Sequence, residues 1–95
     1  MANRSREWSE DIAKKLKKKS YRQEFFVSLI EDDCLTIREA IKVIAKTMGN
    51  QEFSQLIDMA PSNTSRAVNP NNDIKTTTLE KILKKIGCEL SVRAA

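Results

Sequence analysis

Polar side chains suited to contacting nucleic acid are concentrated in one stretch of this chain, residues 49–68. The stretch is expected to form two short helices joined by a tight turn. The second begins near Pro61, a residue favoured at the first helical position. A short helix held outward by its own scaffold can enter the major groove of DNA. The residues that we expect to face the bases are Ser62, Asn63, Ser65 and Arg66.

These side chains have chemistry that matches base edges or phosphates. Asparagine can pair with adenine through two hydrogen bonds, and arginine can pair with guanine in the same way. Ser62 and Ser65 lie one helical turn apart, and each hydroxyl can donate or accept. For Arg66, a guanine contact and a phosphate clamp are both open interpretations.

Further polar residues on both sides of this stretch are candidates for contacts with the DNA backbone. Asn50 and Gln51 begin the first of the two helices, where backbone N–H groups and amide side chains suit a phosphate. Asn72 and Lys75 follow the second helix in a loop rich in turn-forming residues. Turn formation alone is the alternative explanation for this loop, and it is the favoured one for Asn69.

The composition excludes several classes of function. Histidine, the commonest general base and zinc ligand, is absent, and Gly49 and Gly87 are the only glycines. A glycine-rich phosphate loop is therefore excluded. Cys34 and Cys88 alone do not form a zinc site, and they favour a reducing, cytoplasmic environment. No apolar run suits a membrane span and no secretory signal is recognisable. We expect a non-enzymatic cytoplasmic protein without cofactor or metal.

The net charge of +4 is unevenly distributed. Residues 1–20 contain seven basic and three acidic side chains, a charge of +4. Residues 21–35 contain one basic and four acidic side chains, a charge of −3. Residues 36–95 contain nine basic and six acidic side chains, a charge of +3. An acidic segment between two basic ones suits a protein with two different partners.

The N-terminal part is expected to contain two helices. Trp8 and Leu16 belong to one narrow apolar stripe of a helix over residues 7–18. This helix is either solvated and loosely held by Trp8, or its lysines contact phosphates while the stripe docks on a partner. A second helix is predicted to begin at Ser20, with Gln23 completing a capping box.

Residues 1–35 are predicted to form an extension that binds a protein partner. Most aromatic residues of the chain lie here, and acidic residues gather near the end of the second helix. Acids at a helix C-terminus oppose the macrodipole, which indicates either fraying or a partner. Such carboxylates complement a basic protein and steer association. The candidate partner-binding residues are Trp8, Tyr21, Glu24, Glu31, Asp32 and Asp33.

Residues 36–95 are predicted to form the DNA-binding domain. Thr36, with Glu39 at the capping-box position, begins a strongly amphipathic helix that Gly49 ends. Asp58 is expected to adopt a left-handed backbone in the turn between the two short helices.

The last part of the domain is predicted to be a helix over residues 76–86, ended by Gly87. Cys88 to Val92 then alternates apolar and polar residues with the period of a strand. Because one strand is not stable alone, it must pair with another segment or another molecule. Together with the preceding helix, it is the candidate dimer surface.

From Tyr21 to Val92 the chain resembles the helix-turn-helix antidote proteins of bacterial addiction modules, the HigA type, within the Cro/repressor-like group. The resemblance rests on the Ile44-Ala45 pair before Gly49, the turn segment, and the stretch LEKILKKIGCELSV. That stretch corresponds to the family's closing helix, its glycine and an apolar strand. The resemblance implies a mainly all-α, Cro/repressor-like helix-turn-helix domain of five to six helices with a short C-terminal β-strand.

The chain departs from the family pattern within the helix-turn-helix segment and the following loop. Phe53-Ser54 stands for leucine-alanine, Asp58 for the turn glycine, Ala60 for a capping serine, Thr64 for an apolar residue, and Asn72-Asp73-Ile74 for a loop of Gly-Asn-Pro character. The missing cap leaves two starting points for the recognition helix. It begins at Pro61, or it is capped by Ser62.

The resemblance implies an antitoxin that neutralises a co-expressed RelE/ParE-like toxin, generally an mRNA-cleaving nuclease. Such proteins also bind double-stranded operator DNA as homodimers and repress their own operon. One alternative is a stand-alone phage-type or chromosomal repressor without a toxin partner. Another is a protein-interaction module that has lost DNA binding.

Overall fold

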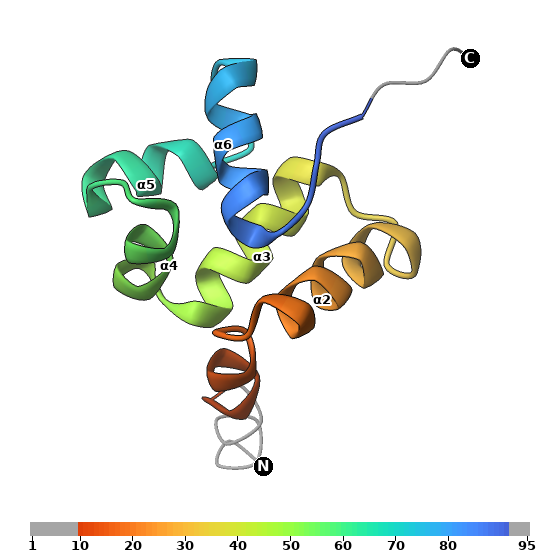
Figure 1. Ribbon diagram of the computed structural model, residues 1–95. Coiled ribbons are helices and arrows are strands. Elements are labelled where there is room, and N and C mark those ends of the chain that lie inside the picture. Colours follow the sequence, from red (N-terminus) through yellow and green to blue (C-terminus); the bar gives the residue numbers. More distant parts are fainter. Residues whose placement is uncertain (1–9, 92–95) are drawn as a thin grey trace.

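The computed structural model describes residues 10–91, and in this range helices are joined by short loops (Figure 1). A mainly all-α architecture is therefore confirmed for this part of the chain. No helix in it is long and apolar enough to cross a membrane. After a helical segment at residues 10–15, the helices are α2 (Lys19–Glu31), α3 (Ile37–Met48), α4 (Asn50–Ile57), α5 (Pro61–Val68) and α6 (Thr76–Ile86).

Helix α3 is the central element of the fold. Its first turn is fixed by the expected capping box, in which the Thr36 hydroxyl accepts from the Glu39 N–H and the Glu39 carboxylate accepts from the Thr36 N–H. Its apolar stripe packs against α2, α4 and α5. Figure 1 shows α2 on one side of α3 and α4 with α5 on the other. Ile41 and Ile44 of this stripe are almost fully buried.

The turn between α4 and α5 forms as expected. Asp58 adopts a left-handed backbone with φ 56° and ψ 53°, a conformation that Asp tolerates better than most residues. Helix α5 begins at Pro61, and its N-cap residue Ala60 makes no side-chain hydrogen bond. The choice between Pro61 and Ser62 as the start of this helix is thereby resolved in favour of Pro61.

The start of α2 differs from the prediction. The helix begins at Lys19 without a side-chain cap, so the capping box of Ser20 and Gln23 is wrong. The Gln23 side chain is used elsewhere, because its amide donates to the Gly87 carbonyl at 2.6 Å. A Cβ on Gly87 would lie 2.7 Å from the Gln23 side chain. Glycine is therefore required at the end of α6 for close approach as well as for its positive φ.

The first helix ends earlier than predicted. Within the described range, helical structure covers residues 10–15, and a turn replaces it at residues 16–18. Leu16 nevertheless is fully buried, in agreement with its place in the apolar stripe. The carbonyls of Leu16 and Lys17 leave the helical pattern and accept hydrogen bonds from the Arg22 guanidinium.

The predicted C-terminal strand does not form in the described residues. Residues 88–91 continue from α6 without regular structure, and Val92 lies outside the described range. A single extended segment lacks the neighbour that a sheet requires. The segment with the alternating pattern therefore has no neighbouring strand to pair with within residues 10–91.

The hydrophobic core continues across the predicted boundary between residues 35 and 36. Phe26 and Leu29 of α2 belong to the same buried cluster as Ile44 of α3 and Ile82 of α6. Helix α2 packs against both α3 and α6. The second half of the predicted extension is thus an integral part of the folded core.

Candidate nucleic-acid interface

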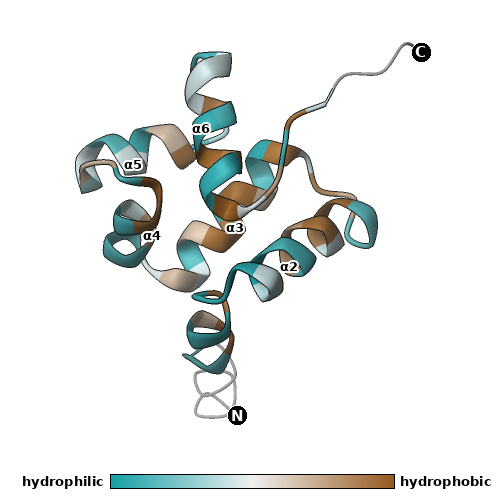
Figure 2. Ribbon diagram, viewed as in Figure 1, coloured by the Kyte–Doolittle hydropathy of each residue, from teal (hydrophilic) through white to brown (hydrophobic). Residues whose placement is uncertain are grey.

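Helix α5 exposes most of its polar side chains and packs one of its faces against the interior of the protein. Figure 2 shows that most of this helix is polar, in contrast to the apolar residues of α3. Thr64 and Ala67 face the interior, with Thr64 fully buried. The four candidate base-contacting side chains are all exposed: Ser62, Asn63, Ser65 and Arg66.

A buried pair of hydroxyl groups joins α4 to α5. Ser54 Oγ lies 2.8 Å from Thr64 Oγ1. The pair is completed by two backbone carbonyls, since Ser54 Oγ also lies 2.6 Å from the Asn50 carbonyl and Thr64 Oγ1 lies 3.1 Å from the Ala60 carbonyl. These hydroxyls occupy two positions where the resembled family has apolar residues. The two departures compensate each other, because each polar group provides the partner that the other needs.

Arg38 of α3 holds the C-terminal end of α5 against the following loop. Its Nη2 donates to the carbonyls of Ala67, Asn69 and Asn72 at 3.1, 2.7 and 2.8 Å. Its Nε is buried without a hydrogen-bond partner among the described residues. The sequence interpretation missed Arg38. A signal was present, because Arg38 lies three residues before the buried Ile41 and therefore on the same helical face.

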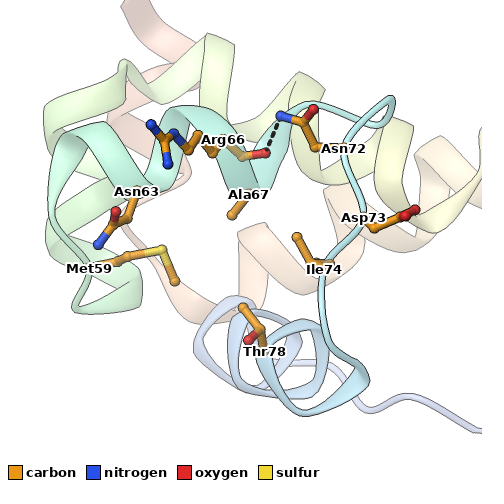
Figure 3. A pocket seen from close by; sticks show the side chains of 8 residues that line it. All are labelled: Met59, Asn63, Arg66, Ala67, Asn72, Asp73, Ile74 and Thr78. Carbon is orange, nitrogen blue, oxygen red and sulfur yellow. Dashed lines mark hydrogen bonds between the residues drawn. The ribbon is translucent and has the colours of Figure 1, made fainter.

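An open hollow of about 600 Å³ lies between α5, the following loop and the start of α6. Figure 3 shows Asn63 and Arg66 on the α5 side of this hollow and Thr78 on the α6 side. Met59, Ala67 and Ile74 contribute apolar surface, and polar side chains surround it. The surface next to the exposed face of α5 is therefore concave.

The asparagines of the following loop are used largely for local structure. The Asn72 side-chain amide donates to the Arg66 carbonyl at 3.2 Å, a contact drawn in Figure 3. The Asn69 side-chain oxygen accepts from the Asn71 N–H at 3.0 Å, in agreement with its expected turn role. Asn72 is exposed, but its amide group already positions the end of α5.

The remaining backbone-contact candidates lie at two helix starts. Asn50 and Gln51 are exposed in the first turn of α4. The Asn50 amide donates to the Pro61 carbonyl at 3.2 Å, which places the start of α4 beside the start of α5. Lys75 is exposed immediately before α6, whose first turn has no side-chain cap. Uncapped N–H groups at a helix start suit an anion.

The candidate partner-binding residues occupy a different part of the molecule. Trp8 lies outside the described residues. Tyr21 is half-buried, stacks on Phe25 with ring centroids 6.1 Å apart, and has the Lys15 ammonium 6.0 Å from its ring centre. The acidic candidates are all exposed on α2 or just after it: Glu24, Glu31, Asp32 and Asp33.

Arg22 is a second buried arginine that the sequence interpretation missed. Only 6% of its surface is exposed. Its Nε and Nη2 donate to the carbonyls of Ile86 and Lys85 at the end of α6, both at 3.0 Å. Desolvation lowers the pKa of Arg22, and the nearby Cys88 acts in the opposite direction. Its position four residues before the buried Phe26 was the available signal.

Comparison with known proteins gives no assignment for this chain. No known family matches it, and neither curated proteins nor solved structures gave a match.

Proposed function

We propose that this protein is a sequence-specific DNA-binding regulator with a Cro/repressor-like helix-turn-helix. The observation that carries the proposal is the exposed polar face of α5, on a helix fixed to α4 by a left-handed turn and a buried hydroxyl pair. Preorganised side chains on a rigid helix are what major-groove recognition requires. In this role α5 is the recognition helix, and α4 crosses the DNA backbone.

The contacts are divided between bases and phosphates. Ser62, Asn63 and Arg66 face base edges, since they lie on the exposed side of α5. Gln51 and Lys75 lie at the starts of α4 and α6, which have no side-chain cap, and contact phosphates on either side of the recognition helix. Asn50 and Asn72 mainly position α5, because their amides bind the Pro61 and Arg66 carbonyls.

The functional unit is a homodimer. The charge of +3 on residues 36–95 gives one copy only weak electrostatic attraction to DNA. Two copies that span half-sites about 34 Å apart overcome this weakness. Leu90 and Ser91 support the dimer, because their backbone groups have no hydrogen-bond partner among the described residues. Pairing with the same segment of a second copy satisfies them.

We further propose that the regulator is the antitoxin of an addiction module and neutralises a RelE/ParE-like toxin encoded in the same operon. The resemblance of residues 21–92 to HigA-type antidotes supports this role. The exposed carboxylates at the end of α2 also support it, since a toxin that binds RNA carries a basic surface.

Arg66→Ala tests the DNA-binding proposal. Binding to the gene's own upstream DNA, measured by fluorescence anisotropy, should weaken by about 1–3 kcal/mol, with relaxed specificity at one base position if Arg66 contacts guanine. An equal loss on every sequence identifies a phosphate contact. Lys42→Ala is the matched control, because it removes the same charge from an exposed position of α3 that has no proposed contact.

The wild-type protein sets the baseline for this test. Its binding should fall steeply with added salt, and scrambled DNA should bind much more weakly. Equal binding of upstream and scrambled DNA, or no DNA binding even at low salt, would contradict the proposed regulator. The protein-interaction module without DNA binding would then be the remaining alternative.

A further inference from the structure

Val27 is the one large hydrophobic side chain that the described part of the chain leaves exposed, at 43%. It lies in the middle of α2, and on each side of it the surface is hollowed. Other apolar residues of α2 behave differently, since Phe26 and Leu29 are buried in the core. An exposed apolar side chain within a concave surface marks an interaction site more strongly than one on a convex surface.

The two hollows next to Val27 differ in character. The inner one has a volume of about 190 Å³ and is mainly apolar. It is lined by Phe26, Val27, Ile30, Glu31, Ile37, Leu83, Cys88 and Glu89. The outer one, of about 360 Å³, is lined by Gln23, Glu24, Val27, Ser28, Glu31 and Asp32. We call the two together the α2 groove.

The charge of the α2 groove is of one sign. Its lining includes Glu24, Glu31, Asp32 and Glu89, and neither lysine nor arginine. None of these four carboxylates forms a salt bridge within residues 10–91, where the ion pair present joins Lys15 to Asp11. The groove therefore presents unneutralised negative charge around an apolar centre, on a chain whose net charge is +4.

We infer that the α2 groove binds a basic segment of the toxin, which inserts an aliphatic side chain beside Val27. Lysine or arginine residues next to that side chain then lie against Glu24, Glu31 and Asp32. This inference rests on the proposed antitoxin function and gives it a location and a chemistry. A second copy is a poorer occupant, since a two-fold dimer through this groove places acid against acid.

The position of the groove leaves the DNA-reading helix accessible. Helices α2 and α5 lie on opposite sides of α3 in Figure 1. Helix α2 packs on α3 and α6, whereas α5 packs on α3 and α4. One chain can therefore hold the toxin at the α2 groove and DNA at α5 at the same time.

Val27→Asp tests the apolar centre of the groove. The probe is the purified product of the neighbouring reading frame in the operon, and its binding to the full-length protein is followed by surface plasmon resonance. Affinity should fall about tenfold or more, mainly through faster dissociation. Ser20→Asp is the control, since it adds the same charge at an exposed position of α2 that does not line the groove. Thermal unfolding followed by circular dichroism verifies that both variants fold.

Charge reversal tests the rim separately. Glu31→Lys combined with Asp32→Lys should slow association and reduce its dependence on salt. Glu52→Lys, at an exposed position of α4, should change association by no more than about twofold. Binding of the probe should also persist when the antitoxin is saturated with its upstream DNA.

The outcomes distinguish the inference from the function on which it rests. Strong binding of the probe that Val27→Asp leaves unchanged would overturn the groove and preserve the antitoxin function. No binding of the probe to the wild type would overturn both. Loss of probe binding on addition of DNA would contradict simultaneous occupancy of the two surfaces.

Discussion

The hydroxyl groups of Ser54 and Thr64 form a buried polar contact between α4 and α5. Both side chains are buried. Their two hydroxyl protons are shared among three hydrogen-bond contacts, one between the hydroxyls and one from each hydroxyl to a backbone carbonyl. A buried hydroxyl that loses its partner keeps its desolvation cost without compensation. Removal of both hydroxyls avoids that cost, since apolar groups need no partner.

Ser54→Ala and Thr64→Val should therefore be non-additive. Each single variant is expected to lose about 0.5–1.5 kcal/mol of stability in urea denaturation, because the hydrogen bond between the two hydroxyls is lost while the remaining hydroxyl keeps a carbonyl of its own helix as partner. The double variant should lose less than the sum of the two single losses, and the difference is the coupling energy. Additive losses would show that the two hydroxyls do not interact.

Individual residues were predictable where a local rule applied. The exposure of Ser62, Asn63 and Arg66 follows from a helix that starts at Pro61 and buries Ala67. The roles of Arg22 and Arg38 did not follow. Their partners are backbone carbonyls between 5 and 64 positions away in the sequence, and a carbonyl carries no residue-type signal.

Among the secondary-structure elements, helix starts were likewise predictable only where local sequence decides them. The capping box of α3 was predicted correctly because Thr36 and Glu39 are three residues apart and each side chain bonds the backbone of the other. The similar pattern at Ser20 and Gln23 failed because Gln23 binds Gly87 instead. The strand at residues 88–91 could not be decided from the sequence, since a strand exists only with a neighbour.

The α3 capping box should make stability depend on pH through Glu39. Hydrogen bonds from the Thr36 backbone and side chain lower the pKa of the Glu39 carboxyl. Its contribution to stability is therefore fully present above the unfolded-state pKa and is lost as the pH falls through the lower folded-state pKa. Glu39→Gln keeps a neutral capping partner but removes this titration.

Urea denaturation of wild type and Glu39→Gln at a series of pH values measures the effect. The wild type should be the more stable protein at neutral pH, and the gap should close as Glu39 becomes protonated in acid. Glu80→Gln, at an exposed position of α6, gives the background change from loss of one charge. A gap that stays constant with pH would contradict a role for the ionised carboxylate.

For the whole molecule, Arg22 joins segments that are distant in the sequence. Its guanidinium binds carbonyls of Leu16 and Lys17 on one side and of Lys85 and Ile86 on the other. The first pair follows the helical segment at residues 10–15, and the second pair ends α6. Both are C-terminal helix ends, where the backbone carries partial negative charge. A buried positive charge is therefore compensated without a carboxylate.

Arg22→Met should lower the free energy of unfolding by about 2–4 kcal/mol, because it leaves these carbonyls without their charged donor. Lys18→Met is the matched control, since it removes an exposed charge close by in the sequence and should change stability by no more than about 0.5 kcal/mol. Below the unfolding transition, the DNA binding that we propose should keep its wild-type affinity in Arg22→Met, since α2 and α5 lie on opposite sides of α3. A variant as stable as the wild type would show that water compensates these carbonyls equally well. A stable variant with weakened DNA binding would show instead that the α2–α6 contact controls the position of α5.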